Sequence, residues 1–169
     1  LSKAHSDLSA AGIWDTLREI VVDFFSKPGI WLAVLFIVLF RFAEGQVQTI
    51  GPLFLLEARD KGGLGLTTGQ VADVYGWVGT GGFLVGSILG GYFTAWLGLK
   101  RAMPALIVAM GVPNVTFYYL STALPQDMLH IGAAVGVEML GYGFGFVGMI
   151  LYIMQAVAPG RFQTAHYAL

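Results

Sequence analysis

The feature that most constrains this chain is the stretch between Ile30 and Glu57, which is almost entirely apolar. Its first eleven residues, Ile30–Phe40, are apolar without interruption, and a second apolar run, Ile50–Leu56, closes it. An α-helix rises about 1.5 Å per residue and the hydrocarbon core of a bilayer is roughly 30 Å thick. A helix of this length therefore crosses a membrane with some tilt, whereas a soluble core helix would be shorter and polar along one side.

The polar residues within this stretch share one helical face. Arg41, Glu44 and Gln48 stand at i, i+3 and i+7. Charged groups are costly in lipid, so we expect this face to line protein or a water-filled cavity, where it contacts substrate and where Arg41 is available to a carboxylate. The alternative is that Arg41 and Glu44 only neutralise each other.

Composition places the whole chain in the membrane class. Of its 169 residues 56% are hydrophobic and 11% are charged, against about a quarter charged in soluble domains. Its mean hydropathy is +0.73. The net charge of −1 gives no reason to expect nucleic acid, and the absence of cysteine excludes disulfides and thiolate metal sites.

No enzyme signature is present in the sequence. The three histidines, His5, His130 and His166, lack metal-ligand spacing, and no nucleophile motif or phosphate-binding loop occurs. We therefore expect no catalytic residue, no metal and no cofactor. For His166 a polar contact between helices is the expected role.

The hydropathy pattern predicts an all-α, polytopic transmembrane helix bundle. Residues 1–29 form an interfacial, cytoplasmic linker containing an amphipathic helix, for which packing on a neighbouring domain is the alternative. Residues 30–169 form the transmembrane part. Its expected spans are residues 30–57, 68–97, 102–123 (with a kink at Pro113–Asn114) and 128–158, followed by the start of a fifth at 162–169. Because the chain begins without Met and ends inside an apolar stretch, we expect it to be a fragment.

Small residues and one carboxyl distinguish two of the predicted spans. Gly82, Gly86 and Gly90 recur every four residues, a spacing that lets another helix approach closely. Glu138 lies inside the fourth span, and Gly141 and Gly145 share its face, which admits either a helix or a ligand. We expect Glu138, with Glu44, to take part in proton coupling, the alternative being a structural hydrogen bond.

The distribution of basic residues predicts the orientation. With the amino terminus in the cytoplasm, two basic residues, Arg59 and Lys61, fall outside, and six fall inside, as the positive-inside rule requires. The six are Lys3, Arg18, Lys27, Lys100, Arg101 and Arg161.

The segment Gly90–Arg101 resembles the cytoplasmic loop motif of the major facilitator superfamily, Gly-x-x-x-Asp-Arg-x-Gly-Arg-Lys. Gly91, Gly98, Lys100 and Arg101 match it. Ala95 stands where the motif has its acidic residue, so a salt bridge at that position is not expected here.

A longer resemblance, from Pro28 onward, is to the AmpG-type muropeptide permeases of this superfamily. It includes the pair Pro28–Gly29 and is carried by Tyr119–Ser121, Gly132–Val135 with Glu138, the glycines of 141–148, Met154 and the segment Arg161–Leu169. The resemblance implies the seventh to tenth helices and the start of the eleventh, within the C-terminal six-helix half of a twelve-helix transporter. In that fold the seventh and tenth helices line the central cavity, which would place Arg41, Glu44, Gln48 and Glu138 there.

The implied function is proton-driven uptake of anhydromuropeptides, for cell-wall recycling, across the bacterial inner membrane by a multi-pass symporter. The implied partners are the lipid bilayer, the N-terminal half of the same transporter and a small glycan–peptide substrate. Alternatives within the class are carriers of another sugar conjugate, an oligosaccharide or an acyl-CoA-like cargo. Another class, a membrane receptor or a membrane enzyme, would need its site outside this stretch of sequence.

Overall fold

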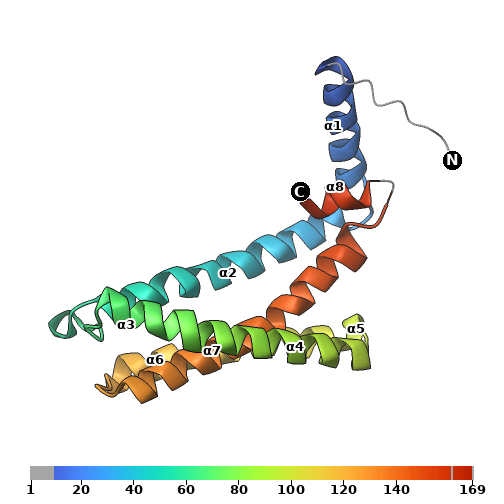
Figure 1. Cartoon of the computed structure of the whole chain (residues 1–169). Coiled ribbons are helices and arrows are strands. Elements are labelled where there is room, and N and C mark those ends of the chain that lie inside the picture. The colour runs from blue at the N-terminus through green and yellow to red at the C-terminus, as the bar shows by residue number, and fades with distance from the viewer. Residues whose placement is uncertain (1–9, 161, 169) are drawn as a thin grey trace. The chain divides into compact units, whose positions relative to one another are not determined.

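The computed structural model describes residues 10–160 and 162–168, and all regular structure within them is helical (Figure 1). This confirms the predicted all-α fold. Lys3, His5 and Arg161, which entered the predictions above, lie outside the described residues. The helices are α1 Ala10–Phe25, α2 Ile30–Leu56, α3 Thr68–Asp73, α4 Thr80–Leu97, α5 Leu99–Gly111, α6 Val115–Ala123, α7 Met128–Tyr152 and α8 Gln163–Ala168.

Four helical stretches among the described residues are long and apolar enough to cross a membrane. They are Ile30–Leu56, Thr68–Leu97, Leu99–Ala123 and Met128–Val157. The third begins at Leu99 rather than at residue 102, because the helix resumes directly after Gly98. The other bounds lie within a residue of those that hydropathy predicts.

The described chain divides into two compact units. The first contains residues 10–38 and 152–168, and the second contains residues 39–151. In the first unit Phe24 of α1, Ile30 at the start of α2 and Val157 form a buried apolar cluster. Trp14 of α1 is 70% exposed and Leu17 is 48% exposed, so the apolar face of α1 is uncovered by the described residues at these positions, whereas Phe24 is buried near its end.

The core of the second unit joins four helices. Leu55 of α2, Val71 of α3, Leu120 of α6 and Val135 of α7 are buried together. In a membrane, close packing of such side chains, rather than their removal from water, stabilises the contact between helices.

Two of the spans are interrupted rather than straight. A π-helical stretch, Val74–Gly79, separates α3 from α4. A 3-10 turn, Val112–Asn114, separates α5 from α6 at Pro113, the position at which the sequence predicts a kink. The π stretch has no counterpart in the sequence prediction.

The loop ends of the second unit are closed by capping groups. The Thr67 hydroxyl and the Gln70 side chain form a reciprocal capping box at the start of α3. Asp127 Oδ1 accepts from the Leu129 N–H at 3.0 Å before α7. This bond and the contact of Asp127 with His130 at 2.8 Å lower the pKa of the Asp127 carboxyl.

Candidate functional site

Three polar side chains meet inside the second unit and are here named the carboxyl cluster: Glu44 and Gln48 of α2 and Glu138 of α7. The Gln48 amide nitrogen donates to Glu44 Oε1 at 3.2 Å and to Glu138 Oε1 at 3.1 Å. Glu44 is 6% exposed and Glu138 is 1% exposed, although charged residues are rarely buried without a partner. The structure thus brings together three of the four residues expected to line the substrate cavity.

The carboxyl cluster holds two buried acids close to a single amide nitrogen. Two ionised carboxylates within reach of a single amide repel each other, and burial penalises the charged form of each. Gln48 supplies two N–H donors, which satisfy one oxygen of each acid.

Arg41, the fourth predicted residue, is exposed and directed elsewhere. One of its guanidinium nitrogens lies 3.5 Å from the Tyr142 hydroxyl, and the guanidinium carbon lies 5.9 Å from the centre of the Phe146 ring. Neither of these contacts involves Glu44, on which Arg41 acts through its charge.

The predicted packing glycines of α4 lie against the backbone of α7. A Cβ on Gly82 would meet Gly136 O at 2.6 Å, and a Cβ on Gly86 or Gly90 would collide with the carbonyl of Leu140 or Phe144, respectively. On the other side of α7, a Cβ on Gly145 would lie 2.5 Å from the Leu106 carbonyl oxygen of α5, and a Cβ on Gly141 would collide with Pro113 and the Ala109 carbonyl. The glycine face beside Glu138 therefore admits a helix, which leaves no room there for a ligand.

The loop-motif residues occupy the junction between α4 and α5. Gly98 has a φ of +76°, which a residue with a Cβ adopts at a cost, and its N–H bonds to Thr94 O at 2.9 Å. Lys100 and Arg101 are exposed in the first turn of α5, and Gly91 has open space around its Cα.

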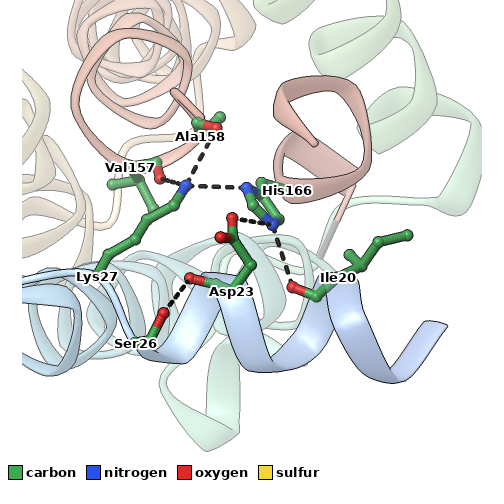
Figure 2. A network of polar contacts seen from close by, with 7 residues as sticks. All are labelled: Ile20, Asp23, Ser26, Lys27, Val157, Ala158 and His166. Atoms are coloured by element: carbon green, nitrogen blue, oxygen red, sulfur yellow. Dashed lines mark hydrogen bonds and ion pairs between the residues drawn. The ribbon is translucent and has the colours of Figure 1, made fainter. Parts of the chain in front are cut away.

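Sequence reasoning missed a polar network in the first unit, shown in Figure 2. The Lys27 ammonium donates to the carbonyls of Val157 at 2.9 Å and Ala158 at 3.2 Å, and to His166 Nδ1 at 2.9 Å. Because an ammonium only donates, His166 Nδ1 accepts and its Nε2–H donates to Ile20 O at 3.1 Å. The His166 side chain is fully buried and makes the polar contact expected for it.

Asp23 completes this network. Its Oδ2 lies 3.7 Å from His166 Nε2. The positive charge of Lys27 lies at the backbone carbonyls that end the fourth span, where a helix carries partial negative charge. The network therefore links α1 to α8 and to the end of the fourth span (Figure 2). Within the described residues no three His, Cys, Asp or Glu side chains gather as a metal site.

Comparison with known proteins gives two similar relatives and no family model. The chain is 28% identical over 158 residues to the anhydromuropeptide permease of Escherichia coli K12 and equally to that of Escherichia coli O157:H7. Each match covers 91% of this chain and 31% of the permease, so the chain spans about a third of its relatives' length. No solved structure matches. Together with the four membrane-length helices, this similarity supports a multi-pass membrane protein.

Proposed function

We propose that this chain is part of a longer secondary transporter of the major facilitator type, in its C-terminal half, that takes up anhydromuropeptides across the bacterial inner membrane. The similarity to two anhydromuropeptide permeases supports the cargo, and their greater length supports the presence of a further half in the same protein. Four membrane-length helices suit a carrier that works by alternating access.

The carboxyl cluster is the observation that carries the proposal of proton coupling. A transporter driven by a proton gradient needs a buried group that accepts a proton on one side and releases it on the other. Glu138 is proposed as this group and Glu44 as its partner. Gln48 holds the two acids together through bonds of 3.1 and 3.2 Å, and Arg41 is proposed to contact anionic groups of the cargo.

Uptake by the full-length protein in sealed vesicles tests the proposal. Labelled anhydromuropeptide is supplied with and without an imposed proton gradient, acid outside. The proposal predicts accumulation above the external concentration only with the gradient, at least tenfold over vesicles without the protein. Facilitated equilibration that ignores the gradient would contradict coupling, and uptake of other sugar conjugates alone would contradict the cargo.

A further inference from the structure

One oxygen of Glu138 has no partner in the structure. Glu138 Oε1 accepts from Gln48, but Oε2 is buried and forms no hydrogen bond with any described residue. Buried polar atoms in folded proteins are nearly always paired, because an unpaired one costs about 1–3 kcal/mol. We therefore expect a hydrogen-bonding group close to Glu138 Oε2.

Tyr75 carries a hydroxyl to the same part of the second unit. It lies in the π-helical stretch and packs, half-buried, on the core that includes Leu55 and Val135. A Cβ on Gly51 of α2 would lie 2.9 Å from the Tyr75 hydroxyl oxygen and 2.8 Å from Phe117 Cζ. The absence of a side chain at Gly51 is thus what lets this hydroxyl reach α2.

The Tyr75 hydroxyl lies beside the carboxyl cluster. Gly51 follows Gln48 by three residues, so the two share a face of α2. Gln48 donates to Glu138 Oε1 at 3.1 Å, and the Tyr75 hydroxyl reaches α2 one helical turn further along, at Gly51. No hydrogen bond of this hydroxyl occurs within residues 10–160 and 162–168, so a donor and a free acceptor stand near each other unpaired.

We propose that Tyr75 is the partner of Glu138 Oε2 and positions this carboxyl through its proton cycle. The phenol O–H donates a hydrogen bond to Oε2 when Glu138 is ionised, and the phenol oxygen accepts a hydrogen bond from the carboxyl O–H when Glu138 is protonated. Neither state requires Tyr75 to lose its own proton. π-Helical turns inside α-helices are frequent at functional sites, and here one carries Tyr75. The inference rests on the proposed function, in which Glu138 carries the proton.

Infrared spectroscopy of the full-length protein tests this pairing directly. The carboxyl C=O stretch of protonated Glu138 is assigned as the band that Glu138→Gln removes from the difference spectrum on acidification. Tyr75→Phe deletes only the hydroxyl, and it is expected to move this band to higher wavenumber because the protonated carboxyl loses its acceptor. Tyr92→Phe, at a 75% exposed tyrosine of α4, is the matched control and is expected to leave the band in place.

A glycine pair on α2 provides a second, independent route to the same result. Gly51→Ala is expected to displace the Tyr75 hydroxyl and to reproduce the band shift, whereas Gly45→Ala, whose Cβ meets nothing within 4 Å, is not. An unshifted Glu138 band in folded Tyr75→Phe would overturn the inference. If Tyr75→Phe does not fold, an unshifted band in folded Gly51→Ala would do so. A wild-type spectrum without the Glu138 band would also overturn it.

Transport separates the inference from the proposed function. Loss of one hydrogen bond to a charged group is worth about 1.5–3 kcal/mol, so Tyr75→Phe is expected to lower gradient-driven accumulation roughly tenfold or more while Tyr92→Phe retains it. A band shift without gradient-driven uptake in wild type would keep the pairing and discard proton coupling. Gradient-driven uptake by wild type, without a band shift in Tyr75→Phe, would keep proton coupling and discard the pairing.

Discussion

Gln48 shows what one residue's sequence position can and cannot predict. Its bond to Glu44 is an i, i+4 contact within α2 and follows from helical spacing. Its bond to Glu138 joins residues 90 apart in sequence and depends on how α2 and α7 pack. The spacing in the sequence therefore predicts the polar face of α2, whereas the contact of Gln48 with Glu138 can be found only from the structure.

Lys27 is the residue that most strongly ties the first unit together. Its ammonium donates to two carbonyls that follow α7 and to the imidazole of His166 in α8. Sequence reasoning assigned Lys27 only to an orientation count, because the three acceptors lie 130 to 139 residues away. Nothing in local spacing points to them.

Replacing Lys27 by Met is expected to loosen α8 without unfolding the second unit. Each bond from a charged donor contributes about 1.5–3 kcal/mol, and a net loss of about 2 kcal/mol corresponds to roughly 30-fold faster amide exchange in α8. Hydrogen–deuterium exchange of residues 163–168 measures this. Lys61→Met, which removes an exposed ion pair to Glu57 of 3.9 Å, is the control, and equal α8 protection in both variants would contradict the assignment.

At the scale of elements, the contact between α4 and α7 depends on glycine. Gly82, Gly86 and Gly90 place the backbone of α4 directly against the carbonyls of α7. The Ser87 hydroxyl adds a bond to Gly143 O at 3.3 Å. Close approach of this kind is the main source of helix association where no water is present to drive it.

Gly86→Ala is expected to destabilise the full-length protein in detergent by roughly 1–3 kcal/mol, the usual cost of overpacking. The reason is that its Cβ would collide with the Leu140 carbonyl, which cannot move without moving α7. Gly81→Ala, five residues earlier in α4 with open space around its Cβ, is expected to be neutral or slightly stabilising. Thermal unfolding compares the two, and equal melting temperatures would refute the packing assignment.

The limits of the helices were largely predictable and their internal irregularities were only partly so. Apolar length defines α2 and the fourth span, and Pro113 marks the break between α5 and α6. The π-helical stretch at Val74–Gly79 contains no proline and has no comparable sequence signal. The sequence therefore provided no reason to consider Tyr75, which this stretch carries, beside Glu138.

At the scale of the whole molecule, two observations support a multi-pass membrane protein. They are the four membrane-length helices and the similarity of most of the chain to anhydromuropeptide permeases. The similarity reaches 91% of the chain, yet it covers 31% of the permeases that it matches. Transport is therefore tested with the full-length protein. The amphipathic α1, in which Trp14 and Leu17 are exposed, is still predicted to lie at the membrane interface.

The most direct test of the account compares wild type with Glu138→Gln in the same vesicles. The amide has the size of the Glu138 carboxyl and its oxygen can still accept from Gln48. Unlike a carboxyl, it does not take up or release a proton near neutral pH. We predict that Glu138→Gln loses gradient-driven accumulation and retains exchange of labelled for unlabelled anhydromuropeptide across the membrane. Glu57→Gln, at an exposed acid beyond α2, is predicted to retain both. Full gradient-driven accumulation by Glu138→Gln would contradict the central claim that this buried acid carries the proton.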